Sequence, residues 1–146
     1  SLALGATGVS LLEITAAYSP FVCGGRYAPP LLITAIDGND GRKIYRAKSA
    51  VRQVLQPTMA KEMNTLLTEV VRDGTGKKAA GPPAPCGGKT GTTNENRDAW
   101  FVGFSRHSIA GIWLGKDDNE SLGSGKSGGA VAAPIWHDFM EKRGAR

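Results

Sequence analysis

Residues 99–115 read Ala-Trp-Phe-Val-Gly-Phe-Ser-Arg-His-Ser-Ile-Ala-Gly-Ile-Trp-Leu-Gly. Two apolar runs, 99–104 and 109–115, stand on either side of four more polar residues. Apolar runs of this length are typical of buried strands, and the link between them suits an antiparallel connection. This stretch therefore predicts two consecutive buried strands of an antiparallel sheet.

Two helices are expected before these strands. Ser10-Leu11-Leu12-Glu13 fits a capping box at the start of a helix that should run to about Val22, with a kink or an early stop at Pro20. A second helix should begin at Pro57, where apolar residues recur with the period of a helix. This apolar stripe, which is expected to face the core, consists of Met59, Met63, Leu66, Leu67, Val70 and Val71.

A hairpin is expected between the two helices. Residues 31–36 and 42–46 resemble strands, and residues 37–41 between them are dense in turn-forming residues. Residues 51–55 are expected to extend this hairpin.

The remaining segments are loops and a last helix. Residues 77–85, rich in Gly, Pro and Ala, predict an exposed and mobile loop, and residues 116–129 predict another. Residues 130–142 predict a helix with Pro134 in its first turn. Its apolar side should carry Ile135, Trp136, Phe139 and Met140. The order of elements indicates one α+β unit over residues 1–146, an antiparallel sheet with flanking helices.

The composition excludes several classes of protein. Eighteen Lys and Arg against thirteen Asp and Glu give a net charge of +5, and 40% of the residues are hydrophobic, which argues against a disordered chain. Basic residues occur singly or in pairs with acidic residues between them, so nucleic acid is not expected as a partner. The two cysteines, Cys23 and Cys86, have neither CxxC nor metal-binding spacing.

Phosphate, metal and cofactor sites are not expected. Residues 88–90 and 125–127 end like a P-loop, but the first glycine of that motif would fall on Pro83 and Glu120. His107 and His137 stand far apart and have no neighbouring His or Cys. We therefore predict no metal and no cofactor.

The stretch Lys89-Thr90-Gly91-Thr92 has the residue types of a site that binds a carboxylate. On a strand, Thr90 and Thr92 share one face, where their hydroxyls can hold an anion. Gly91 lets another backbone approach closely, and the strand edge offers N–H groups to an oxyanion. Lys89 adds positive charge. The Lys-Thr-Gly triplet is a signature of β-lactamases and penicillin-binding proteins.

The surrounding residues extend this likeness. Lys89–Asn94, Arg97–Phe104 and Trp113–Asn119 together resemble the transpeptidase domain of class A, bifunctional penicillin-binding proteins. The resemblance also covers Ser1–Gly5, Val9, Glu13, Ala16–Tyr18, Gly74–Ala79, Gly128–Gly129, Pro134–Trp136 and Asp138–Met140. It spans nearly the whole chain in the same order, and it implies the transpeptidase fold of that family.

By this resemblance, the chain is part of a peptidoglycan D,D-transpeptidase. In that family a serine attacks the D-Ala–D-Ala bond of a stem peptide, the amine of a neighbouring strand takes the acyl group, and β-lactams mimic the donor. The resemblance implies that Lys89 works through electrostatics and proton traffic. Thr90 and Thr92 would hold the substrate carboxylate around Gly91, and the Thr92 N–H would be half of the oxyanion hole. Thr93 and Asn94 would line the cleft.

Two motifs of the family are absent from the sequence. The family uses Ser-x-x-Lys for the nucleophile and Ser-x-Asn for the second motif, and no serine in the 146 residues is followed by either pattern. In the family both motifs precede the segment that Ser1–Gly5 resembles. We therefore expect the C-terminal half of a transpeptidase domain, inactive by itself. The absent N-terminal half would cover an apolar face, through which the isolated chain is expected to self-associate.

The resemblance also implies partners and a location. Stem peptides and β-lactams are the expected ligands. The expected location is the periplasm or the outer face of the bacterial inner membrane, on a parent protein anchored by an N-terminal helix outside this sequence. That location permits a Cys23–Cys86 disulfide, but the sequence does not show whether the two residues meet. The alternative to an enzyme is a non-catalytic module that uses the same fold to hold peptidoglycan or a protein partner.

Overall fold

The computed structural model describes residues 8–48, 50–81 and 85–144. They form an α+β fold, as the sequence predicted, in which three small antiparallel sheets combine with helices. The elements are α1 (Leu11–Ala16), α2 (Ser19–Val22), β1 (Arg26–Tyr27), β2 (Ala35–Asp37), β3 (Lys43–Arg46), β4 (Arg52–Gln53), α3 (Pro57–Arg72), η2 (Lys77–Ala79), β5 (Gly87–Thr92), η3 (Asn94–Asn96), β6 (Asp98–Phe104), β7 (Ile109–Gly115), η4 (Gly128–Ala132) and α4 (Ala133–Gly144).

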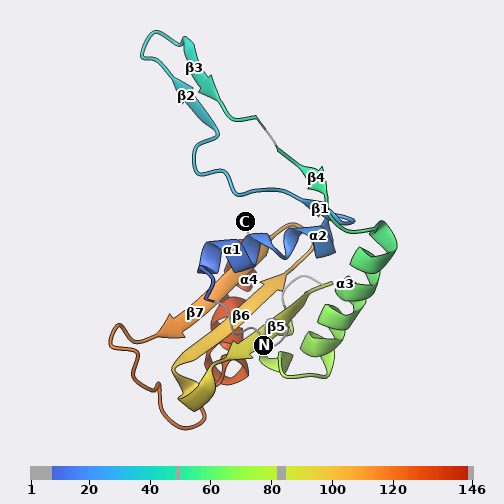
Figure 1. Ribbon diagram of the computed structural model, residues 1–146, viewed down its shortest axis with the longest axis vertical. Coiled ribbons are helices and arrows are strands. Elements are labelled where there is room, and N and C mark those ends of the chain that lie inside the picture. The colour runs from blue at the N-terminus through green and yellow to red at the C-terminus, as the bar shows by residue number, and fades with distance from the viewer. Residues whose placement is uncertain (1–7, 49, 82–84, 145–146) are drawn as a thin grey trace.

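The central sheet has the order β5-β6-β7, and all its pairs are antiparallel. It confirms the two strands predicted from residues 99–115, although β6 is mostly buried and β7 only half-buried. Helix α1 packs on one face of the sheet and α4 on the other (Figure 1). The backbone of α1 comes close because Gly111 has no side chain, and a Cβ there would collide with Thr15. On the other face, Trp136 Nε1 donates to the Ala110 carbonyl at 3.1 Å.

One apolar cluster fills the space between the sheet and α4. Phe101 and Trp136 are completely buried and meet edge to face, with ring centroids 5.3 Å apart. The other buried members of the cluster are Val71, Ala79, Ala132, Ala133 and Met140. Because these residues come from α3, η2, η4 and α4, one cluster joins four elements to the sheet.

The N-terminal helix is interrupted, as predicted, but the break lies before Pro20 rather than at it. The capping box is present, since Ser10 Oγ accepts from the Glu13 N–H at 3.2 Å and the Glu13 carboxylate accepts from the Ser10 N–H at 2.9 Å. The helix breaks after Ala16, however, one turn before Pro20, and resumes as α2. Pro20 has no N–H for the Ala16 carbonyl and its ring crowds that carbonyl. The Ser19 hydroxyl donates to the Ala16 carbonyl instead, at 2.8 Å.

The hairpin arm, residues 28–48, is only partly as predicted. Strands β2 and β3 pair, but residues 31–34 form no strand and are exposed. Just beyond the end of β3, the Ala47 N–H still donates to the Thr34 carbonyl at 2.9 Å. The prediction that residues 51–55 extend the hairpin is wrong. Their β4 pairs with β1, a two-residue strand that has no visible sequence pattern. The arm extends away from the central sheet (Figure 1).

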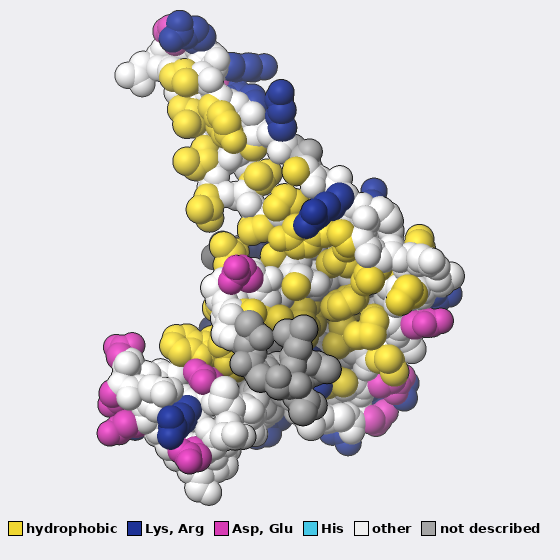
Figure 2. Space-filling view, viewed as in Figure 1, with side chains coloured by type: hydrophobic (Ala, Val, Ile, Leu, Met, Phe, Trp, Pro, Cys, Tyr) yellow, Lys and Arg dark blue, Asp and Glu magenta, His cyan; other side chains and the backbone are white. Residues whose placement is uncertain are grey.

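The apolar stripe of α3 faces the core on one side only. Leu67 and Val71 are buried, but Met59, Met63 and Leu66 are exposed, Leu66 by 60%. A single stripe on an amphipathic helix meets as much apolar surface as its neighbours provide, and β5 covers only part of it. Apolar side chains form a continuous area from the arm over the face that carries α1, α2 and α3 (Figure 2). We call this area the open apolar face. The exposed large apolar side chains of the elements that carry it include Leu12 of α1 and Met59, Met63 and Leu66 of α3.

The predictions for the loops and the last helix need two corrections. The segment predicted as an exposed loop, residues 77–85, begins with η2, and Ala79 in it is completely buried; residues 82–84 lie outside the described part. In the last helix Trp136 and Met140 are buried as expected, whereas Ile135 and Phe139 are 43% and 48% exposed. The sheet contacts only one narrow side of α4. A π-helical turn, η4, directly precedes α4.

The two cysteines do not form the disulfide that an extracytoplasmic location would permit. Cys23 is exposed and Cys86 is half-buried, and both thiols are free. Burial raises the pKa of the Cys86 thiol.

We expect the Phe101–Trp136 contact to dominate stability. Trp136→Ala should lower the free energy of unfolding by about 3–5 kcal/mol, because it leaves a cavity in a fully packed cluster. Phe139→Ala, one turn later on the same helix and half-exposed, should cost no more than about 1 kcal/mol. Urea unfolding followed by tryptophan fluorescence and circular dichroism measures both. Equal losses for the two variants would contradict the assignment of the core.

Candidate functional site

Strand β5 carries the predicted Lys-Thr-Gly-Thr stretch and lies at the edge of the central sheet. Thr90 pairs with Phe101 and Thr92 with Ala99, so both threonines share the face on which α4 packs. Lys89 and Gly91 belong to the opposite face. No described strand pairs with the outer edge of β5, so some backbone N–H groups of this strand point away from the sheet and remain accessible.

Lys89 is exposed, and its ammonium group bends back over its own strand. Its Nζ donates to the Thr90 carbonyl at 2.9 Å and lies 3.4 Å from Thr90 Oγ1. The Lys89 ammonium group therefore lies at the outer edge of β5, where a bound molecule can reach it.

The two threonine hydroxyls contact segments far away in the sequence. Thr90 Oγ1 lies 2.7 Å from Thr75 Oγ1, in the turn that joins α3 to η2. Thr92 Oγ1 accepts from the Gly128 N–H at 3.0 Å, at the start of η4. Gly128 allows this approach because a Cβ there would collide with the carbonyls of Gly91 and Trp100. The turn before η2 and the start of η4 therefore meet over β5.

Thr93 and Asn94 are not placed with these threonines. Thr93 Oγ1 donates to Asp98 Oδ2 at 3.0 Å and accepts from the Asp98 N–H at 2.8 Å. Asn94 opens the short helix η3. Trp100, on a strand predicted to be buried, is half-buried, with its ring centroid 6.0 Å from that of Trp113.

A hollow of about 420 Å³ opens where these segments meet. We call it the threonine–lysine hollow. It is lined by Thr75, Lys77, Lys78, Thr90, Thr92, Ser127, Gly129 and Ala130. Sequence reasoning assigned Thr90 and Thr92 to the site but missed the other six. Gly74–Ala79 already formed part of the family resemblance, but nothing in the sequence pattern placed it beside Thr90.

The hollow combines hydroxyl groups with positive charge. None of its lining residues, all from the described part of the chain, carries a carboxylate. Asp73 lies just before this turn. A hydrogen bond from Arg72, and to a smaller extent the positive charge of Lys77, holds the pKa of Asp73 below its ordinary value. Asp73 does not line the hollow, and its carboxylate accepts from Arg72 Nε at 2.6 Å.

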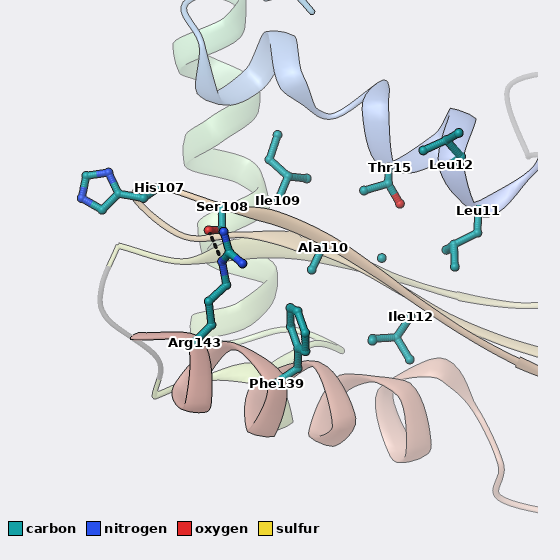
Figure 3. Close-up of a pocket in the computed structure, with 11 residues that line it drawn as sticks. Leu11, Leu12, Thr15, His107, Ser108, Ile109, Ala110, Ile112, Phe139 and Arg143 are labelled. Carbon is teal, nitrogen blue, oxygen red and sulfur yellow. Dashed lines mark hydrogen bonds between the residues drawn. The ribbon is translucent and has the colours of Figure 1, made fainter. Parts of the chain in front are cut away.

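A larger cavity of about 760 Å³ lies along β7, between α1 and α4 (Figure 3). Its walls are mainly apolar, and it contains none of the predicted site residues. Its polar groups include Thr15 Oγ1, which is buried without a hydrogen-bond partner, and Arg143, whose Nε donates to Ser108 Oγ at 2.9 Å. The outer edge of β7 has no partner strand among the described residues. This cavity is therefore suited to packing rather than to chemistry.

Neither a metal-binding cluster of side chains nor a membrane-spanning helix is found in the part of the chain that the structure describes. Within residues 8–48, 50–81 and 85–144, no group of three or more His, Cys, Asp or Glu side chains is arranged to hold a metal ion. None of the helices in these ranges is both long and apolar enough to cross a membrane.

Comparison with known proteins places these features in a family. The family model of the penicillin-binding protein transpeptidase domain matches residues 1–141. Penicillin-binding protein 1A of Aquifex aeolicus is 39% identical over 141 residues, which cover 97% of this chain and 19% of that protein. Penicillin-binding protein 1A of Neisseria gonorrhoeae is 37% identical over 146 residues. The chain thus spans about a fifth of the length of the curated relatives it matches.

Solved structures agree with this placement. The crystal structure of penicillin-binding protein 1A from Haemophilus influenzae has a TM-score of 0.90 at 26% identity, covering 97% of this chain and 27% of that one. Penicillin-binding protein 3 from Mycobacterium tuberculosis, in complex with aztreonam, has a TM-score of 0.72 at 25% identity, covering 92% and 34%. The fold, the sequence match and its extent agree, and the chain belongs to the family of penicillin-binding protein transpeptidase domains.

Proposed function

We propose that this chain supplies the substrate-binding edge of a peptidoglycan D,D-transpeptidase. The observation that carries the proposal is the juxtaposition of Lys89, Thr90 and Thr92 on the open edge of β5, beside a cationic hollow. Relatives named penicillin-binding proteins support it, as does the relative that binds aztreonam, a β-lactam. The proposed ligands are stem peptides and β-lactams, both of which carry a carboxylate.

Each residue has a proposed part in acyl transfer. The hydroxyls of Thr90 and Thr92 bind the carboxylate of the donor peptide and so fix its scissile carbonyl beside the strand. When a serine attacks that carbonyl, the Thr92 N–H stabilises the oxyanion. Lys89 lowers the energy of the negative charges and assists proton transfer as terminal D-alanine leaves. An acceptor amine then attacks the acyl-serine and completes the cross-link.

The serine of this reaction is proposed to lie on another polypeptide segment. None of the serines in the 146 residues is part of a Ser-x-x-Lys motif. Two uncovered surfaces support the proposal that a further segment packs against this one. The open apolar face leaves large side chains exposed, and β7 presents a seven-residue edge, Ile109–Gly115, without a charged residue or proline. Such edges are normally paired or covered.

The proposed location, with peptidoglycan as substrate, is outside the cytoplasm.

Labelling with a fluorescent penicillin tests the catalytic proposal. The isolated chain should give no covalent band on a denaturing gel, because it lacks the serine. Mixed or co-expressed with the preceding part of the transpeptidase domain of the Aquifex aeolicus relative, which we expect to supply the Ser-x-x-Lys and Ser-x-Asn motifs, it should support a band that neither polypeptide gives alone. A covalent band from the isolated chain would overturn the proposal that the chain is inactive by itself.

Threonine variants in the same mixture test the role of β5. Thr92→Val should lower the labelling rate about ten- to a hundredfold, the expected loss for one hydrogen bond to a charged group. Thr92→Ser should restore most of the rate. Thr65→Val is the matched control, since that exposed threonine bonds only to the Lys61 carbonyl of its own helix, at 3.1 Å. If labelling is unchanged in Thr92→Val, a non-catalytic module that holds peptidoglycan or a partner becomes the better description.

Self-association tests the open apolar face. At micromolar concentration the isolated chain should sediment as dimers or larger species, because exposed apolar areas of this kind associate in water. Met63→Glu combined with Leu66→Glu should shift it towards the monomer, whereas Lys61→Glu on the polar side of α3 should not. Analytical ultracentrifugation measures both effects. A chain that stays monomeric at all concentrations would show that this face needs no cover.

A further inference from the structure

We propose that Lys77 and Lys78 on η2, together with the Thr75 hydroxyl, form the part of the site that selects a carboxylate group. This inference rests on the proposed function, which places a substrate carboxylate at Thr90 and Thr92. It adds the η2 lysines to Lys89 as charges that recognise this carboxylate, and it makes the turn before η2 a specificity determinant.

Positive charge reaches the two threonines from both faces of β5. Thr90 and Thr92 face the threonine–lysine hollow, on the α4 side of the sheet, whereas Lys89 pairs with Val102 and leaves the strand on the other side. The Lys89 side chain then bends back to the strand edge, where its ammonium group donates to the Thr90 carbonyl at 2.9 Å and lies 3.4 Å from Thr90 Oγ1. Lys77 and Lys78 line the hollow itself. A carboxylate at the threonines therefore meets the η2 lysines across the hollow.

The hydroxyl groups of the hollow have hydrogens left to donate. A threonine hydroxyl has one hydrogen and two lone pairs. In the Thr75–Thr90 pair, at 2.7 Å, only one hydrogen lies between the two oxygens, so the other remains available whichever residue donates. Thr92 Oγ1 accepts from the Gly128 N–H and keeps its own hydrogen. The threonines thus offer two O–H donors, which match the two oxygens of one carboxylate, and Ser127 adds a further hydroxyl to the lining.

The walls of the hollow are fixed by contacts outside it. Ala79, the last residue of η2, is completely buried in the core cluster. On the other side, a Cβ on Gly129 would collide with the Thr75 carbonyl. The backbone that carries Lys77 and Lys78 is therefore held against β5 before any ligand binds, which reduces the ordering cost of binding.

Titration of the unaltered chain with N-acetyl-D-Ala-D-Ala and with its C-terminal amide tests this inference. Heteronuclear NMR should show tighter binding of the acid than of the amide, with shifted amide signals at residues 75–78, 90–92 and 127–130. Two exposed charge contacts together are expected to change affinity about three- to tenfold. The Lys77→Ala, Lys78→Ala double variant should lose most of this preference, and its affinity for the acid should fall less steeply as salt is raised, because Lys89 remains.

Two single variants complete the test. Lys89→Ala should weaken binding of the acid but keep part of the preference, and Lys61→Ala, an exposed lysine of α3, should leave all affinities unchanged. The inference is overturned if the double variant prefers the acid as strongly as the unaltered chain does, if Lys89→Ala abolishes the preference, or if the unaltered chain shows none. Because no serine takes part, the outcome is independent of penicillin labelling. Failed labelling with an intact, lysine-dependent acid preference would overturn the transpeptidase proposal and leave the carboxylate site standing.

Discussion

The edge-to-face contact between Phe101 and Trp136 is the interaction on which the rest of the structure depends. Phe101 lies on β6, directly opposite Thr90 in the register of the sheet. The cluster around the two rings includes Val71 at the end of α3, Ala79 in η2 and Ala132 in η4. Every wall of the threonine–lysine hollow is therefore attached to the same buried cluster. A polar, exposed site obtains its fixed geometry from apolar contacts directly beneath it.

The two sides of the sheet differ in how complete they are. On the α4 side, the cluster is closed and its large side chains are buried. On the α1 side, a continuous apolar area remains open (Figure 2), and the cavity along β7 follows an unpaired strand edge (Figure 3). The site residues belong to the complete side and to the edge of β5. The hollow can therefore be preformed while the open apolar face still lacks a cover.

Local patterns in the sequence were sufficient for the parts of the fold that depend on local interactions. The capping box of Ser10 and Glu13, the start of α3 at Pro57 and the pair of strands in residues 99–115 follow from spacing alone. The errors concern contacts between distant residues. Whether residues 51–55 pair with the hairpin or with β1, and whether Ile135 or Trp136 faces the sheet, depends on which neighbours are present.

The candidate site shows the same division. The motif pattern found Lys89, Thr90 and Thr92 because they are consecutive or alternate on one strand. Thr75, Lys77 and Lys78 were missed as site residues because the contact that brings them in, between Thr75 and Thr90, joins residues on two elements. A backbone that places hydroxyl groups and lysines around a hollow without any carboxylate is organised to bind an anion, whether or not a nucleophile is near. Under the proposed function, recognition of the carboxylate and chemistry at the carbonyl are therefore physically separable. We propose that the first depends on β5, η2 and η4, and the second on a serine that these 146 residues do not supply in the family's motif.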